Sequence, residues 1–359
     1  MKHWRIFTTM VFLLAACIVL TGCGGNGDTK VTAAGGSQGS EGPTSPAAAA
    51  PAVAEYIIKV GHTTSENHSS HLTFVKFKEL VEAKSAGRIG VEIYPNGTLG
   101  NDRECIEGVQ MGTITMTGIS SAMVAQFEKS LSIFDLPFLF PNRETAYKVF
   151  EDPAVGGVLK TNMEAKGFVC LGFAEAGYRN LTTTAKQVKT MADLKGMKIR
   201  TMSSNYHVAA WEAYGASPTP ISFSELYTAL QQKTVDGQEN PYGLILSQKF
   251  NEVQPYCTET GHILTVVPLI INKEFVDSLP DDLEKAVLEA GAEAVQYNYG
   301  LAQEEEETAK QELIDSGMEI FPLANEEKDK FRKAAMVVYD AMKAEIGSDI
   351  IDAALVHLN

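Results

Sequence analysis

Residues 226–241 read LYTALQQKTVDGQENP, and this stretch closes a repeating pattern of strands and helices. Its first half belongs to a helix that we predict over residues 222–233. Before it, the sequence predicts a strand at 167–174, a helix at 191–195 and a strand at 198–201. Strands that alternate with helices are typical of α/β proteins in which helices cover largely parallel sheets.

The same alternation begins near residue 55. Residues 55–61 predict a first strand, and apolar positions spaced along residues 71–83 predict a helix. Residues 89–94 alternate apolar and polar side chains as a strand does, and residues 102–111 predict a second helix. The body that follows residue 54 has about 305 residues, too many for one ordinary core, which indicates two domains.

Residues 281–316 predict one helix that is longer than ordinary globular helices. At 1.5 Å per residue it would extend about 50 Å, enough to cross from one domain to the other. We interpret its acidic run, Glu304 to Glu307, as a solvated face without a function.

The first 54 residues differ from the rest. Lys2 and Arg5 precede a short apolar run, and the sequence LTGC follows at residues 20–23. This pattern is typical of a secretory signal, and LTGC resembles a lipobox, which implies a signal peptide over 1–22 and a lipid on Cys23. The alternative is an uncleaved anchor helix. Residues 23–54, rich in Gly, Ser, Thr, Pro and Ala, predict a flexible tether.

Composition excludes some classes of function. A net charge of −15 argues against a nucleic-acid partner, which needs a basic face. It does not exclude an anionic ligand, because bulk charge is screened beyond about 8 Å. Beyond the signal and Cys23, the cysteines are Cys105, Cys170 and Cys257; one disulfide is possible, but we favour three small buried apolar residues.

No catalytic pattern stands out. The sequence has no nucleophile elbow, no HExxH and no phosphate-binding glycine loop, so we predict that the protein is not an enzyme and uses no cofactor. His62, His68 and His71 lie close in sequence but have no Cys, Asp or Glu partner defined by spacing. They indicate a metal site only weakly, and we interpret them as surface or pocket-rim residues.

Two arginines are the strongest candidates for a binding function. Arg179 follows an apolar stretch, and Arg200 ends the sequence KGMKIR at a short strand. Guanidinium matches a carboxylate with two parallel hydrogen bonds, and α/β proteins bind ligands at the carboxyl ends of strands. The residues alone leave two interpretations open, an anion clamp or an ion pair between domains.

Several segments together resemble the solute-binding proteins of TRAP transporters, the DctP family. Residues 226–241 look like the signature of that family. Four further segments fit in family order: YPNGTLGNDRE at 94–104, FDLPFLF at 134–140, DLKGMKIR at 193–200 and GASPTP at 215–220. Asn272, Lys273 and the SLP sequence at 278–280 complete the set, and the resemblance covers residues 56–316.

The resemblance implies an α/β, two-domain, periplasmic-binding-protein-like fold with a ligand cleft between the domains and a long bridging helix. We expect domain I at 55–177 plus 268–305, and domain II at 178–267 plus 306–359. The implied function is capture of a small organic acid, a C4-dicarboxylate or a sugar acid such as a uronate, in the periplasm or at the outer face of the cytoplasmic membrane. The implied partner is a TRAP membrane permease; the alternative is a sensing subunit that presents the acid to a receptor kinase.

The resemblance also assigns the site. Arg200 matches the arginine that pairs with the ligand carboxylate, and Arg179 and Asn240 match groups beside it. Phe223 matches an aromatic wall, Thr63 and Ser120 fall where domain I supplies polar contacts, and Glu239 and Tyr242 are weaker candidates, for which bracing and packing are the alternatives. Two positions depart from the family: Thr115 replaces a common Asp, and Ala176 replaces a frequent Asn beside the expected cleft.

Overall fold

The computed structural model describes residues 54–358. The predicted signal peptide, almost all of the predicted tether and Cys23 lie outside this range. Within it, no helix combines the length and the apolar character needed to span a bilayer.

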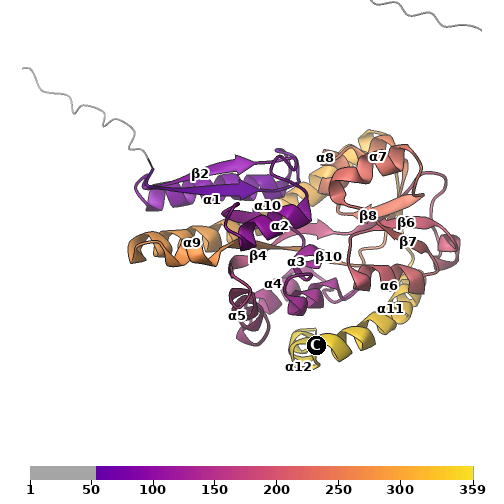
Figure 1. Ribbon diagram of the computed structural model, residues 1–359. Coiled ribbons are helices and arrows are strands. Elements are labelled where there is room, and N and C mark those ends of the chain that lie inside the picture. The colour runs from indigo at the N-terminus through magenta and orange to yellow at the C-terminus, as the bar shows by residue number, and fades with distance from the viewer. Residues whose placement is uncertain (1–53, 359) are drawn as a thin grey trace, which may run out of the picture. The chain divides into compact units, whose positions relative to one another are not determined.

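Two β-sheets organise the described chain (Figure 1). Sheet A has the strand order β2-β1-β3-β10-β4, and sheet B has the order β11-β9-β5-β8-β6-β7. The strands of sheet A are β1 (Tyr56–Gly61), β2 (Ile89–Tyr94), β3 (Met116–Gly118), β4 (Phe168–Tyr178) and β10 (Leu264–Asn272). The strands of sheet B are β5 (Asn180–Thr183), β6 (Lys198–Thr201), β7 (Ser217–Pro220), β8 (Gly237–Asn240), β9 (Tyr256–Glu259) and β11 (Glu319–Pro322).

The sheets are mixed, which corrects the expectation of largely parallel sheets. β10 is antiparallel to both β3 and β4, and β5 is antiparallel to both β8 and β9. The reason is the connection between the sheets: β4 leads through Arg179 directly into β5, and β9 leads through residues 260–263 into β10. The domain boundaries at 177/178 and 267/268 stay a prediction.

Helices pack on both sheets, and their starts follow local chemistry. The side chain of Asn101 accepts the backbone N–H of Glu104 and the Glu104 side chain accepts that of Asn101, a capping box that begins α2. The helices are α1 (Ser69–Lys84), α2 (Asp102–Gln110), α3 (Ser121–Val124), α4 (Arg143–Glu151), α5 (Val158–Glu164), α6 (Asn205–Ala213), α7 (Leu226–Gln231), α8 (Tyr242–Ser247), α9 (Lys273–Asp277), α10 (Asp281–Asp315), α11 (Asn325–Ile346) and α12 (Asp349–Val356). Shorter turns are η1 (Lys129–Asp135), η2 (Pro153–Gly157), η3 (Met191–Leu194), η4 (Phe223–Glu225) and η5 (Phe250–Glu252).

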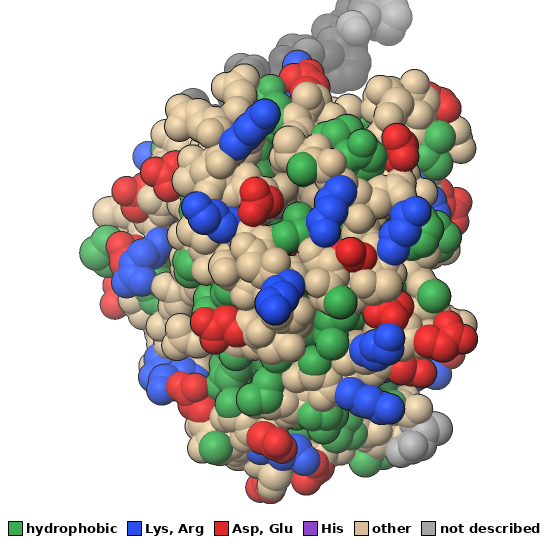
Figure 2. All heavy atoms as spheres, turned by 90° about the vertical axis from the view of Figure 1, so that its right-hand side faces the viewer, with side chains coloured by type: hydrophobic (Ala, Val, Ile, Leu, Met, Phe, Trp, Pro, Cys, Tyr) green, Lys and Arg blue, Asp and Glu red, His purple; other side chains and the backbone are tan. Residues whose placement is uncertain are grey.

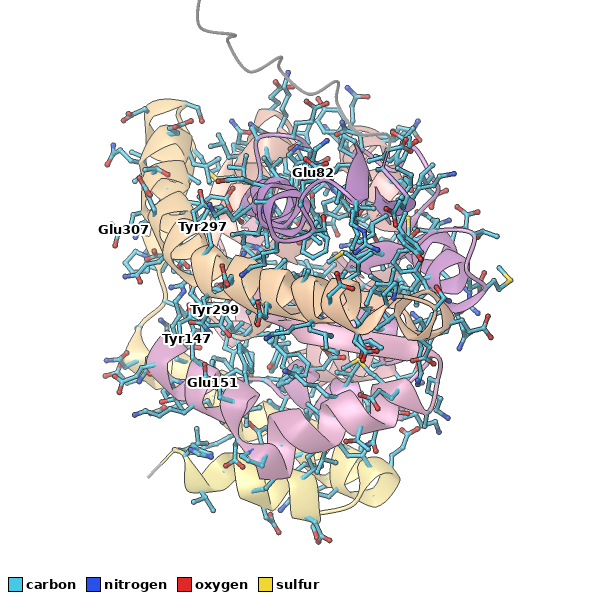
Figure 3. All side chains as sticks on the ribbon, turned by 90° about the vertical axis from the view of Figure 1, so that its left-hand side faces the viewer. Glu82, Tyr147, Glu151, Tyr297, Tyr299 and Glu307 are labelled. Carbon is cyan, nitrogen blue, oxygen red and sulfur yellow. The ribbon has the colours of Figure 1, made fainter. Side chains whose placement is uncertain are left out.

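The long helix α10 runs past both sheets, as the sequence predicts. Its first half buries Leu283, Val287 and Val295 against α1 and sheet A. Its second half buries Ala309 and Leu313 with α7 and α8 on sheet B. Figure 3 shows the helix as one continuous element, with Tyr299 close to Tyr147 of α4, where the two rings stack at 3.7 Å.

The acidic run of α10 is only partly solvated, which corrects its interpretation as a functionless exposed face. Glu304 and Glu307 are exposed, but Glu305 accepts the backbone N–H of Ser69 at 2.8 Å, at the start of α1. Glu306 pairs with Arg143, which also pairs with buried Glu175 of β4. The run therefore ties α10 to α1 and to the end of β4.

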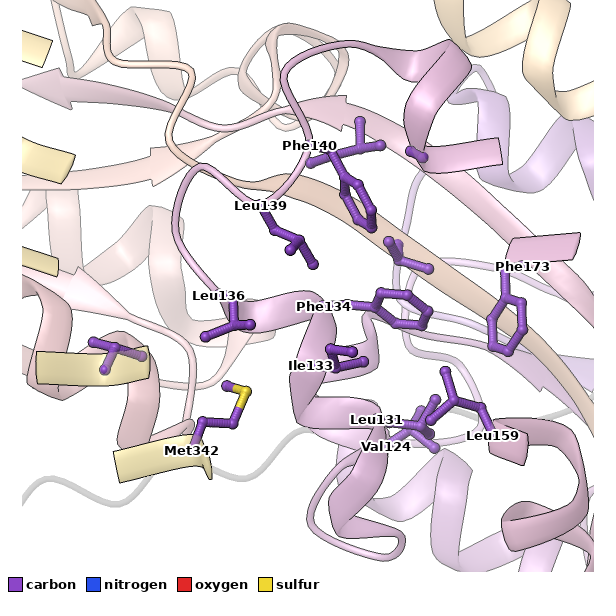
Figure 4. Packing of buried hydrophobic residues seen from close by; sticks show 14 of the residues in the cluster. Val124, Leu131, Ile133, Phe134, Leu136, Leu139, Phe140, Leu159, Phe173 and Met342 are labelled. Atoms are coloured by element: carbon purple, nitrogen blue, oxygen red, sulfur yellow. The ribbon is translucent and has the colours of Figure 1, made fainter. Parts of the chain in front are cut away.

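Apolar side chains on the two faces of sheet A enter different cores. Along β10, Val266 and Ile270 join one cluster, whereas Val267 and Leu269 join the other. The first cluster contains the FDLPFLF segment, whose Phe134 meets Phe173 of β4 at a ring distance of 5.3 Å (Figure 4). That segment is thus a packing element under the sheet.

Charged side chains of both signs are interspersed on the face shown in Figure 2. Exposed ion pairs, such as Lys129 with Glu345, contribute little to stability because water and salt screen them. The ion pairs at the strand ends are buried, so water and salt screen them much less.

Candidate ligand-binding cleft

A cleft lies where strands of both sheets end. Thr63 follows β1, Ser120 follows β3, Arg200 lies in β6 and Asn240 ends β8. The cleft has a cavity volume of about 60 Å³. Its lining residues are Thr63, Thr64, His68, Ser70, Asp102, Gly118, Ile119, Ser120, Ala176, Arg179, Arg200, Met202, Phe223, Asn240, Leu244, Thr265 and Val267.

Arg200 is the least satisfied charged group of this cleft. Its side chain is 1 % exposed, and its Nε donates to the carbonyl oxygen of Ile221 at 2.9 Å. Its Nη1 is buried and, within residues 54–358, has no hydrogen-bond partner. Burial and the nearby Arg179 lower the pKa of Arg200 to about 10, so the group is charged at neutral pH. An unpartnered buried donor is costly, and an anion in the cleft would relieve it.

Arg179 is also 1 % exposed, but its charge is already paired. Both its Nε and its Nη2 donate to the carboxylate of Glu239, and Nη2 also reaches the Asn240 side-chain oxygen at 3.1 Å. Its Nη1 donates to Thr265 at 3.2 Å. Although burial opposes ionisation, Arg179 and two histidines hold the pKa of Glu239 well below its usual range.

Two histidines complete this buried network. His262 Nε2 lies 3.0 Å from Glu239. His207 faces carboxylates on both sides, with Nδ1 3.8 Å from Glu239 and Nε2 3.5 Å from Asp135. Burial alone would lower the pKa of His207, but the two carboxylates outweigh it and raise that pKa to about 9.

The wall on the sheet B side has one aromatic and one amide. Half-buried Phe223 contacts Phe250 edge-on at a ring distance of 6.1 Å, which holds it against the cleft. The Asn240 side chain is fixed between Arg179 and Gln238.

The wall on the sheet A side is polar. Thr63 donates to Asp102 Oδ1 at 2.6 Å, and Ser120 stands half-buried at the start of α3 with no capping bond from its side chain. Burial raises the pKa of Asp102, whereas the Thr63 hydrogen bond and the charge of Arg200 act in the opposite direction.

Six of the eight sequence-derived candidates therefore line one cleft, and two do not. Glu239 lies behind Arg179, where it holds that guanidinium. Tyr242 belongs to α8, which directs its hydroxyl to Glu259 at 2.9 Å, so the structure places it in a different pocket. The strand that carries Arg200 has its predicted bounds, 198–201, with Arg200 as its third residue.

Sequence reasoning missed Asp102 as a cleft residue. It was expected at the start of a helix, which it is, but the same position turns its carboxylate into the cleft. Met202 and Leu244 are further lining residues without a sequence signal, whereas His68, interpreted from the sequence as a surface or pocket-rim residue, is buried and lines the cleft. The departure at Ala176 does lie in the cleft, whereas Thr115 accepts the backbone N–H of Lys59 at 3.1 Å between strands.

The other residues singled out in the sequence, the histidines near α1 and the three cysteines, pack within the protein. His62 Nε2 lies 3.1 Å from His71 Nδ1, and within residues 54–358 no group of three or more His, Cys, Asp or Glu side chains could hold a metal ion. His71 belongs to α1, and His62 stacks on Phe74 of the same helix, where it is buried rather than at a rim. Cys105, Cys170 and Cys257 are buried and free, as favoured from the sequence.

The chain folds into two α/β parts that are joined by crossing strands and a long helix. A buried arginine lies in the cleft between their strand ends. This combination is that of a solute-binding protein. The chain matches the family described as "Bacterial extracellular solute-binding protein, family 7" (DctP) over residues 60–345. It belongs to this family, which confirms the resemblance to TRAP-transporter solute-binding proteins and the fold that it implied.

Individual relatives support the same family assignment. The chain is 34 % identical over 297 residues to the 2,3-diketo-L-gulonate-binding periplasmic protein YiaO of Escherichia coli, covering 80 % of this chain and 90 % of YiaO. It is 36 % identical over 307 residues to the C4-dicarboxylate-binding periplasmic protein DctP of Rhodobacter capsulatus, covering 84 % and 91 %. The solved sugar acid binding protein DctPAm of Advenella mimigardefordensis, in complex with galactonate, superposes with a TM-score of 0.82 at 31 % identity, covering 85 % of this chain and 98 % of that one.

Proposed function

We propose that this protein captures a small organic acid outside the cytoplasm by clamping its carboxylate with Arg200, and delivers the acid to a TRAP-type membrane permease without chemical change. Asn240 and Arg179 border the carboxylate, Phe223 forms a wall beside it, and Thr63 and Ser120 contact the rest of the ligand. Glu239 acts indirectly by holding Arg179.

One observation carries this proposal. The Nη1 of Arg200 is buried and unpartnered within the described chain, and it lies in a cleft lined from both sheets. A carboxylate forms two parallel charge-assisted hydrogen bonds with a guanidinium. The relatives support the ligand class, since 2,3-diketo-L-gulonate, C4-dicarboxylates and galactonate are all carboxylates.

Substitution of Arg200 tests the clamp. Thermal-shift screening of organic acids identifies a ligand, which stabilises the folded form by mass action. Titration calorimetry then compares the wild type with Arg200→Ala. We expect at least a tenfold increase in Kd, about 1.4 kcal/mol, because the variant buries a carboxylate without its partner.

Two further variants make this test specific. Arg200→Lys keeps the charge but loses the planar fork, so it should bind with intermediate affinity. Arg332→Ala removes an exposed arginine of α11 that pairs with Asp329, and its affinity should equal that of the wild type. Unchanged affinity in Arg200→Ala would sink the clamp assignment.

The anchor and the delivery step are separate parts of the proposal. Cys23, in its lipobox-like sequence, would carry a lipid that holds the protein at the membrane, with residues 23–54 as a tether. We expect the full chain to take up radiolabelled fatty acid in bacterial cells and the Cys23→Ala variant to take up none; equal labelling would exclude this lipid site. Uptake by the permease subunits in proteoliposomes, dependent on this protein, tests delivery.

A further inference from the structure

The charge balance inside the cleft limits what the ligand can carry. Among the described lining residues, the basic side chains are Arg179, Arg200 and His68. Arg179 is neutralised by Glu239. His68 accepts the backbone N–H of Ser70 through Nδ1, and burial lowers its pKa, so it is neutral near pH 7. Arg200 is therefore the one uncompensated cation among these residues.

Asp102 shares the cleft with Arg200. It comes from α2 on the sheet A side, whereas Arg200 comes from β6 of sheet B. The two side chains influence each other electrostatically, but they are not within ion-pair distance in the described structure. Asp102 stands in the first turn of α2, where the helix dipole favours a negative charge. A ligand held by Arg200 would thus extend toward a carboxylate.

Asp102 also has accepting capacity left. Thr63 donates to Oδ1, and within residues 54–358 no side-chain hydrogen bond reaches Oδ2. The same wall carries the hydroxyl groups of Thr63, Thr64, Ser70 and Ser120. Such a surface suits ligand hydroxyl groups, which can donate to Asp102 and exchange hydrogen bonds with the threonines and serines.

We infer that the cleft selects acids with one carboxylate and several hydroxyl groups, such as aldonates or uronates, and disfavours dicarboxylates, with Asp102 as the selecting residue. This rests on the proposed function, in which Arg200 holds the first carboxylate. A second carboxylate would meet no free cation, so its burial in the cleft would be costly. It would also face Asp102. Burial raises the pKa of Asp102, whereas the Thr63 hydrogen bond and the charge of Arg200 favour its ionised form, and in that form like charges at close range disfavour binding. A hydroxyl group at the same place donates to Asp102.

Matched pairs of acids test this selection by titration calorimetry. Erythronate and tartrate have four carbons, and gluconate and glucarate have six; within each pair the second acid replaces a terminal hydroxymethyl group by a carboxylate. Glucuronate, galacturonate, succinate and malate widen the panel. We expect the tightest ligand to be a monocarboxylate and, for the better pair, at least a tenfold lower Kd for the monocarboxylate.

Asp102→Asn removes the charge and keeps the shape. In this variant, the ratio of the dicarboxylate Kd to the Kd of its matched monocarboxylate should be at least threefold smaller than in the wild type. Glu104→Gln is the matched control, because Glu104 stands two residues further along α2, outside the cleft lining, and glutamine also satisfies the capping box. The control should keep the wild-type ratio.

The outcomes separate this inference from the function beneath it. If dicarboxylates bind the wild type as tightly as their matches, and Arg200→Ala abolishes this binding, only the inference is overturned. If Asp102→Asn and Glu104→Gln change the ratio equally, Asp102 is not the selecting residue. If no acid of either class binds, or if Arg200→Ala binds all of them unchanged, the proposed function falls as well.

Discussion

Arg179 and Arg200 show how surroundings decide what a residue does. Both are arginines with 1 % exposed side chains; Arg179 lies between β4 and β5, and Arg200 lies in β6. Arg179 makes an ion pair with Glu239, so it mainly orders the network around it. Arg200 has no such partner in the described chain, and its free Nη1 is what makes it a clamp candidate. The sequence left both interpretations open for both arginines.

His207 belongs to the same network and predicts a pH dependence. A neutral imidazole has one N–H, yet both nitrogens of His207 face carboxylates, which only accept hydrogen bonds when ionised. The protonated form is therefore favoured, with a folded pKa near 9 against about 6.5 when unfolded.

The sign of the effect follows from linkage. Because the folded pKa is the higher one, the stabilisation is fully present below about pH 6.5 and is lost as the pH rises through about 9. We expect the free energy of unfolding, measured by denaturant titration, to fall by a few kcal/mol across this window. His207→Gln should flatten this decline; an equally steep decline in that variant would assign it to other groups.

At the scale of elements, α10 is the clearest example of a helix whose glycines differ in role. Gly291 lies against β4, and a Cβ added there would stand 2.6 Å from the Cβ of Leu171. Gly300 is exposed, and a Cβ added there would meet nothing within 4 Å. Both have helical backbone, so helix propensity alone would favour alanine at both.

This pair gives a matched prediction. Gly291→Ala should lower the free energy of unfolding by about 1–3 kcal/mol, because the overpacked contact forces α10 away from β4. Gly300→Ala should raise it by up to about 1 kcal/mol through helix propensity. Denaturant titrations of the two variants beside the wild type measure both changes, and a stabilised Gly291→Ala would contradict the close packing of α10 on sheet A.

Helices and strands with a clear periodicity of apolar residues were predictable from the sequence. The strand at 89–94 has its predicted bounds, and α10 ends within one residue of its predicted end, because periodicity is a local property. β4 runs on to Tyr178, beyond the predicted 174, because buried Glu175 is satisfied by Arg143 and Tyr147, which lie far away in sequence. Such contacts are invisible to a local pattern.

At the scale of the whole molecule, the site was predictable only where a motif marked it. The resemblance named six residues that share one cleft, whereas Asp102 required the fold, since it meets Thr63 from a distance of 39 positions along the chain. Tyr242 follows the QENP motif directly but points away, because α8 begins there and turns its side chain toward Glu259. Sequence adjacency to a motif does not fix the direction of a side chain.

The burial of Arg200 implies that the cleft must open to admit a ligand. A ligand reaches a side chain that is 1 % exposed only if the two walls of the cleft separate. The connections that would absorb such a hinge motion are the crossing at Arg179, residues 260–263 and α10. Closure around the acid would exclude water from the carboxylate–guanidinium pair and so strengthen it.

A crystal structure of the protein with its bound acid tests the central claim most directly. We predict the ligand between the two walls of the cleft, with both oxygens of its carboxylate within hydrogen-bonding distance of the Arg200 guanidinium, about 2.7–2.9 Å. A ligand bound in another pocket, or a carboxylate in this cleft that leaves Arg200 unpartnered, would contradict the account.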